Sequence, residues 1–140
     1  MSGIQSRKVI LGAVGYTVCT FALAILWHVV LFESQYQEFR YFEGEPSFLT
    51  GFVTILLQGL ILSMLFPMVR LKGTAITRGL NFAAIIGLFF WTSHVLAFVA
   101  KQTIPQTVSF ILMESLYLVF QFGVFGLLIG IIYRSEDAPQ

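Results

Sequence analysis

Two histidines lie inside long apolar runs of this sequence, each close after a tryptophan. The segments read WHVVLF from Trp27 and WTSHVLAF from Trp91, so His28 and His94 have similar surroundings. Glu114 is the one carboxylate within such a run. An ionised carboxylate costs roughly 2.5–3.5 kcal/mol or more at the centre of a bilayer, and ionisable groups there usually face the bundle interior and find a polar partner. We therefore expect Glu114 to face inward and to hydrogen-bond His28, His94 or a glutamine.

The spacing of these residues places them at one level. A helix rises 1.5 Å per residue, so the histidines and the carboxylate lie within roughly 4 Å of a common depth when counted from the outer ends of their runs. Two glutamines fall deeper, near the middle of their runs. The residues expected to form a ligand or proton site are His28, His94, Glu114, Gln58, Gln121, Trp27 and Trp91.

This polar set allows three interpretations. It is a structural network that fixes the register of the helices, or a site for a ligand, proton or small substrate that opens outward. The third interpretation is a haem b with His28 and His94 as axial ligands. The sequence predicts no cofactor, with haem b as the alternative. It also predicts no metal site, since no E-x-x-H or H-x-x-x-H spacing is present to support metal binding by the histidines and Glu114.

Other chemistry leaves no signature in the sequence. There is no glycine-rich phosphate loop with a lysine, and no G-x-S-x-G or similar nucleophile motif. The single cysteine, Cys19, excludes an intrachain disulfide and is expected to be a small packing residue. We therefore expect no catalytic residue and a non-enzymatic accessory, binding or small transport protein.

The elements that carry these residues are transmembrane helices. The chain has 140 residues, of which 57% are hydrophobic and 11% charged, whereas soluble domains carry about 25% charged residues. An apolar helix of about 20 residues crosses the hydrocarbon core of a bilayer. Four runs qualify, at residues 9–32, 48–69, 79–100 and 108–133. The predicted fold is all-α: a polytopic membrane protein with a four-transmembrane-helix bundle in a single domain, residues 1–140.

Basic residues predict the orientation of this bundle. Six of the eight flank the runs on the side of the termini: Arg7, Lys8, Arg70, Lys72, Arg78 and Arg134. Arg40 and Lys101 lie on the other side. The positive-inside rule then places both termini in the cytoplasm. The net charge of +1 gives no basic field for nucleic acid, so the expected partners are the lipid bilayer and either a second copy or a membrane complex.

The longest outer loop, residues 33–47, is rich in acids and aromatic rings. Phe32, Tyr36 and Phe39 recur at helical spacing, which predicts that the first helix continues or turns along the interface. The tyrosines and phenylalanines are typical of an aromatic belt at the membrane surface. A docking surface for a partner or substrate is the alternative. The acids of this loop are Glu33, Glu38, Glu43 and Glu45.

The two halves of the chain resemble each other. WHVVLF is echoed by HVLAF, and PSFLTGFVTILLQG by PQTVSFILMESLYLVFQFG. The halves share one orientation, so a duplication would give two similar helical hairpins related by an axis along the membrane normal. Rows of small residues, at Gly79, Ala83 and Gly87 and again at Gly126 and Gly130, predict close helix packing.

The first half also resembles a known group of proteins. LAILWHVVLFESQYQEF followed by GFVTILLQGLILSMLFP is similar to small four-span bacterial inner-membrane proteins whose first span ends in L-W-[HY]-x-x-L-F. No activity is assigned to that family, so the resemblance implies a bacterial inner membrane and four spans, but no mechanism. The four runs are fewer than the five spans of the tryptophan-rich sensory proteins.

Overall fold

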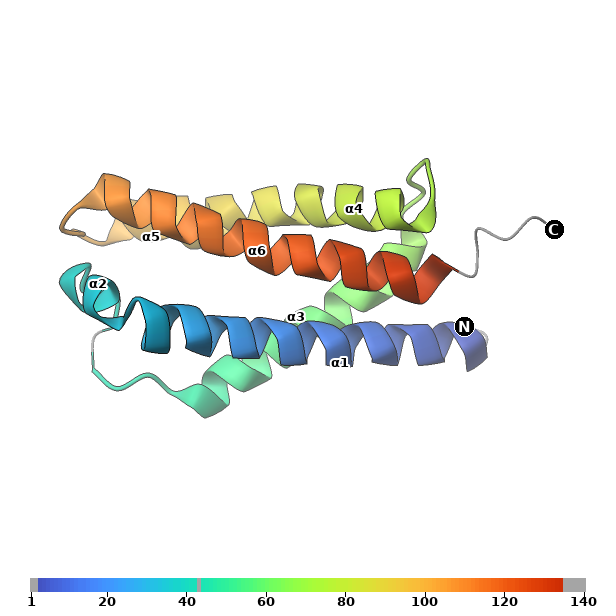
Figure 1. Cartoon of the computed structure of the whole chain (residues 1–140), viewed down its shortest axis with the longest axis horizontal. Coiled ribbons are helices and arrows are strands. Elements are labelled where there is room, and N and C mark those ends of the chain that lie inside the picture. Colours follow the sequence, from blue (N-terminus) through green and yellow to red (C-terminus); the bar gives the residue numbers. More distant parts are fainter. Residues whose placement is uncertain (1–2, 43, 135–140) are drawn as a thin grey trace.

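A computed structural model of the chain describes residues 3–42 and 44–134, and Glu43 therefore lies outside the described residues. Four helices are long and apolar enough to cross a membrane: Gln5–Leu31, Phe48–Met68, Ala75–Lys101 and Thr107–Tyr133. They run along the long axis of the molecule, with Phe48–Met68 oblique to the others (Figure 1). The predicted all-α, four-helix membrane architecture is confirmed for the part of the chain that the structure describes.

Three of the four spans are made of more than one helical element. The elements in chain order are α1 (Gly3–Ile25), the π-helix η1 (Leu26–Leu31), α2 (Glu33–Glu38), α3 (Phe48–Leu65), the 3₁₀-helix η2 (Phe66–Met68), α4 (Ala75–Phe90), the π-helix η3 (Trp91–Leu96), α5 (Ala97–Lys101) and α6 (Thr107–Tyr133). Only the last span is a single uninterrupted α-helix.

Hydroxyl side chains fix where two of the helices begin. The Ser47 hydroxyl accepts a hydrogen bond from the Thr50 N–H at the start of α3, and Thr74 does the same for the Thr77 N–H at the start of α4. Each cap satisfies one of the amide groups that have no partner in the first turn of a helix. The chain therefore leaves the outer loop at a defined residue, which sets the depth of α3.

Two antiparallel hairpins pack into one bundle. α1 packs against α3, α4 packs against α6, and α1 also contacts α6 (Figure 1). The rows of small residues at Gly79, Ala83 and Gly126 lie between α4 and α6. A Cβ atom placed on Gly79 would overlap the Gly126 carbonyl oxygen and lie 2.9 Å from the Gly130 nitrogen. The backbones of the two helices are thus in direct contact, which only glycine allows.

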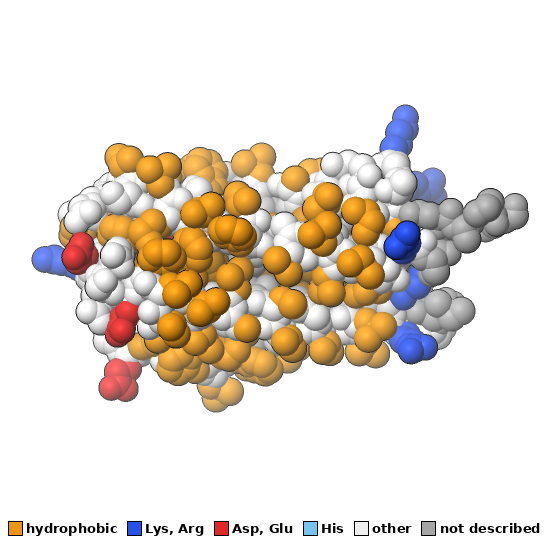
Figure 2. Space-filling model, viewed as in Figure 1, with side chains coloured by type: hydrophobic (Ala, Val, Ile, Leu, Met, Phe, Trp, Pro, Cys, Tyr) orange, Lys and Arg blue, Asp and Glu red, His pale blue; other side chains and the backbone are white. Residues whose placement is uncertain are grey.

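Charge separates the two ends of the bundle. Most lysine and arginine side chains gather at the end with the termini, and the glutamates lie at the opposite end, with apolar side chains between them (Figure 2). We name these the basic end and the acidic end; the acidic end includes α2. Cys19, which the sequence predicts to be a small packing residue, is exposed on this apolar surface and does not pack between the helices.

We predict that Gly79→Ala lowers the free energy of unfolding by about 1–3 kcal/mol, because the added methyl group meets backbone atoms that cannot turn away. Thermal unfolding in one detergent, followed by circular dichroism, measures the loss. Gly123→Ala is the matched control on α6, since a Cβ there meets nothing within 4 Å. Equal stability of the two variants would contradict the close contact of α4 with α6.

Candidate functional site

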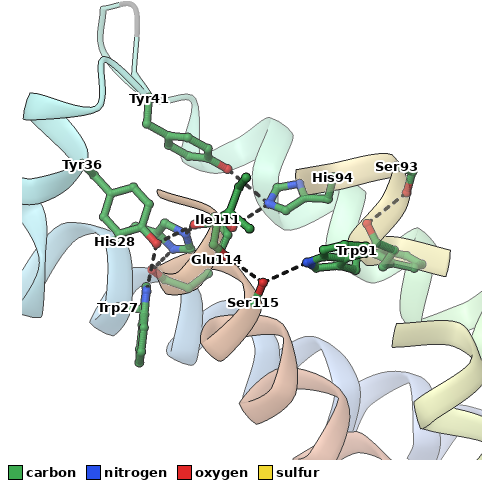
Figure 3. Close-up of polar contacts among 12 residues, drawn as sticks. Trp27, His28, Tyr36, Tyr41, Trp91, Ser93, His94, Ile111, Glu114 and Ser115 are labelled. Carbon is green, nitrogen blue, oxygen red and sulfur yellow. Dashed lines mark hydrogen bonds and ion pairs between the residues drawn. The ribbon is translucent and has the colours of Figure 1, made fainter. Parts of the chain in front are cut away.

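The Glu114 carboxylate is the centre of a buried cluster of polar side chains. Glu114 is 0% exposed. Its Oε1 lies 3.0 Å from His28 Nε2 and 2.5 Å from the Tyr36 hydroxyl, and its Oε2 lies 2.9 Å from His94 Nε2. Figure 3 shows these side chains converging on Glu114 from different elements. The prediction that Glu114 faces inward and hydrogen-bonds a histidine is confirmed, and it bonds both.

Each histidine belongs to a π-helical segment. In η1 the Phe32 N–H donates to the Trp27 carbonyl, and after η3 the Ala97 N–H donates to the Thr92 carbonyl. Both bonds span five residues rather than four, so the turn is wider and the side chains leave the helix in altered directions. His28 and His94 are the side chains that bond the carboxylate on α6. Such π-helical turns are rare and occur frequently at functional sites.

Tyr36 adds a third donor from outside the spans. It belongs to α2, which folds back over the acidic end, and its side chain is 0% exposed. The Trp27 Nε1–H donates to the Tyr36 hydroxyl at 2.9 Å, so the tyrosine proton is directed to Glu114. Burial, and then the negative charge of Glu114, raise the pKa of Tyr36 well above its usual range. The interpretation of Tyr36 as part of an aromatic belt was therefore wrong, since α2 turns it into the core.

Counting donors and acceptors assigns most of the protons in the cluster. His28 Nδ1 lies 3.0 Å from the Ala24 carbonyl, which only accepts, so this nitrogen carries a hydrogen. The second ring nitrogen, His28 Nε2, faces a Glu114 oxygen, and these two atoms can form a hydrogen bond only if they share one further proton. With that proton in place and both rings otherwise neutral, the cluster carries no net charge. His94 is then a neutral ring whose hydrogen is on Nε2, facing Glu114. Its Nδ1 has no partner among the described interactions.

A cavity of about 480 Å³ lies beside this cluster. Its walls come from α1, η1, α3, α4, η3, α6 and the loop before α3, and they include both histidines, Gln58 and Gln121. Volumes of this size, between about 300 and 1,000 Å³, are typical of small-molecule sites. The structure thus brings four of the seven predicted site residues to one cavity.

The other three predicted residues lie elsewhere. Glu114 is behind the histidines and does not line the cavity. Trp27 bonds Tyr36 on the far side of the cluster, and the Trp91 Nε1–H donates to the Ser115 hydroxyl at 2.8 Å (Figure 3). Trp91 and Ser115 line a second hollow, between α4 and α6. The tryptophans therefore hold other polar groups in place.

Tyrosines complete the site, and the sequence analysis did not assign them to it. Tyr41 and Tyr117 line the cavity and pack against the His28 ring, with centroids 5.6 and 4.6 Å away. At the deep end, Tyr16 joins the two glutamines, since its hydroxyl donates to Gln58 Oε1 at 3.2 Å and accepts from Gln121 Nε2 at 2.8 Å. Tyrosines inside or next to apolar runs gave no signal that separated them from ordinary packing residues.

The cluster does not present an open set of ligands for a metal or haem. Among residues 3–42 and 44–134, no group of three or more histidine, cysteine or acidic side chains is arranged to hold a metal ion. Both histidine Nε2 atoms bond the Glu114 carboxylate. Axial ligation of haem through these Nε2 atoms would break both bonds, and the haem b alternative stays a prediction that an absorption spectrum of the oxidised and reduced protein would test.

Comparison of the chain with protein-family models, with curated proteins and with solved structures finds no match. The resemblance of the first half to small four-span bacterial proteins therefore stays a prediction. Inference about function depends on the geometry of the site.

We predict that Glu114→Gln lowers the free energy of unfolding by about 1–3 kcal/mol. A neutral amide has one acceptor oxygen in place of two, and both the Tyr36 hydroxyl and His94 Nε2 donate to this position. Thermal unfolding in detergent measures the change. Glu33→Gln is the matched control, because Glu33 is exposed and bonds only Gln37 within α2 among the described interactions; we expect a change within about 0.5 kcal/mol. If Glu114→Gln unfolds like the control, the cluster does not stabilise the bundle.

Proposed function

We propose that this chain is a non-enzymatic, multi-pass protein of the bacterial inner membrane that binds a small molecule in the cavity between the two hairpins. The observation that carries the proposal is that two histidines and two glutamines from four different elements line one cavity. A polar network that served only to fix helix register would not need space for a ligand beside it. Binding is the common step of an accessory, sensing or small transport role.

The proposed orientation places both termini in the cytoplasm and the cavity toward the outside. Arg70, Lys72 and Arg78 lie at the basic end, together with the described start of α1 and end of α6, and such residues are retained on the cytoplasmic side. The bacterial inner membrane is supported by the resemblance of residues 23–39 and 51–67 to small four-span bacterial proteins.

We predict that an impermeant maleimide added to intact spheroplasts labels Gln102→Cys and leaves Lys72→Cys unlabelled, in a Cys19→Ser background. Both positions are exposed, at the acidic and the basic end respectively. Labelling after cell lysis shows that each cysteine can react. The reverse pattern in spheroplasts would overturn the proposed orientation.

Gly51 offers a direct test of binding in the cavity. It lines the cavity, and a Cβ atom added there meets nothing within 4 Å. The side chain of Gly51→Leu therefore begins in open space beside the cavity. We predict that a small molecule co-purifies with the wild type and is lost from Gly51→Leu, as measured by mass spectrometry of extracts of the purified protein.

Gly123→Leu is the control, because Gly123 has the same open surroundings but lines the other hollow. It should retain the molecule. The same bound molecules in the wild type and in both variants, or none in any, would contradict binding in this cavity.

A further inference from the structure

The walls of the cavity restrict the charge of its ligand. Among the described residues that line it, none is an aspartate, glutamate, lysine or arginine. A positive charge on a histidine of the cluster is balanced by the Glu114 carboxylate, which already bonds both rings. A charged ligand would lose its hydration and find no counter-charge, which is costly in apolar surroundings. The cavity therefore suits an uncharged molecule.

The walls are also mainly apolar and border the lipid. Aromatic rings come from three sides, including Phe21 of α1, Phe48 of α3 and Phe90 of α4. Thr50 and Thr54 line the cavity and are exposed, although they lie within a membrane span. α3 runs obliquely to the other helices (Figure 1). A ligand can thus enter sideways from the bilayer, past the outer half of α3.

Two polar atoms remain to orient such a ligand. His94 Nε2 faces Glu114, so Nδ1 of the neutral ring is a hydrogen-bond acceptor without a described partner. Gln58 accepts from Tyr16 through Oε1, and its Nε2 has no described partner and can donate. A hydroxyl group can donate to the His94 acceptor or accept from the Gln58 donor. An ether or a ketone cannot donate to His94.

We propose that the ligand of this cavity is an uncharged, membrane-soluble alcohol whose hydroxyl group bonds His94 and whose apolar body packs on the aromatic walls. This inference rests on the proposed function and names its ligand class. If the inference holds, a ligand that carries a charge should occupy the cavity less than the alcohol does. A ligand whose hydroxyl hydrogen is replaced, as in an ether, should also occupy it less.

Photoactivatable probes test the inference in the full-length protein, reconstituted in phosphatidylcholine nanodiscs at neutral pH. The probes are a fatty alcohol carrying an alkyl diazirine, its methyl ether, and the corresponding fatty acid and alkylamine. After illumination, mass spectrometry of peptides measures labelling of the segments 41–58 and 90–94. We expect the alcohol to label them about tenfold or more above the other three probes, and to compete with an unlabelled alcohol.

Variants that fill the cavity provide the control. Gly51→Leu and, as a second variant, Thr54→Phe should abolish this labelling, whereas Gly123→Leu should keep it. Equal labelling by the alcohol and its ether would overturn the role of the hydroxyl group. Stronger labelling by the acid or the amine would overturn the uncharged class while binding in the cavity stands. If no probe labels these segments and no molecule co-purifies with the wild type, both the inference and the proposed function fail.

Discussion

A single buried carboxylate organises the acidic half of this bundle. Glu114 forms hydrogen bonds with side chains of η1, η3 and α2, so three separate parts of the chain are tied to α6 at one point. Each donor compensates part of the cost of removing a carboxylate from water, and removal of a donor would leave that cost uncompensated. The position of α2 over the end of the bundle follows from the same interaction, since Tyr36 reaches Glu114 only when α2 folds back.

The π-helical turns explain how two rigid spans supply donors to the same group. A regular α-helix fixes the directions in which successive side chains leave it, and a π-turn changes them at one place. Both odd-numbered spans contain such a turn at their Trp and His residues. This shared local structure is an additional likeness between the two halves, beyond the matching segments of sequence. Common ancestry of the halves stays a prediction.

The cavity and the cluster share the two histidines, and this gives the site its chemical character. His28 and His94 form part of the cavity wall and also bond the carboxylate behind it. The ring nitrogen that faces Glu114 determines which nitrogen remains for a ligand, so a residue with no contact to the cavity controls the hydrogen bonding inside it. Tyr41, which also lines the cavity, stays neutral because burial and the charge of Glu114 raise its pKa.

The sequence by itself determined the four helices, their approximate ends and the inward direction of Glu114. Long uncharged runs have few alternatives to membrane spans, and a carboxylate in lipid requires a polar partner. The rows of small residues also predicted close helix packing, and the structure shows that this packing joins α4 to α6. These features depend on local composition and on the properties of the bilayer, and both can be read along the chain.

Tertiary structure alone decided which polar residues meet. Tyr36 and Tyr41 follow the first span in an acidic loop whose composition matches a membrane-surface belt, and only the folding of α2 onto the bundle buries Tyr36. The tryptophans are close to the histidines in sequence, yet they bond Tyr36 and Ser115. Consecutive residues such as Trp27 and His28 do not share a face of a helix, and the π-helical turn of η3 changes the directions in which Trp91 and His94 leave their helix. The cavity exists because α3 lies at an angle to the other helices, and that angle depends on packing between segments far apart in the sequence.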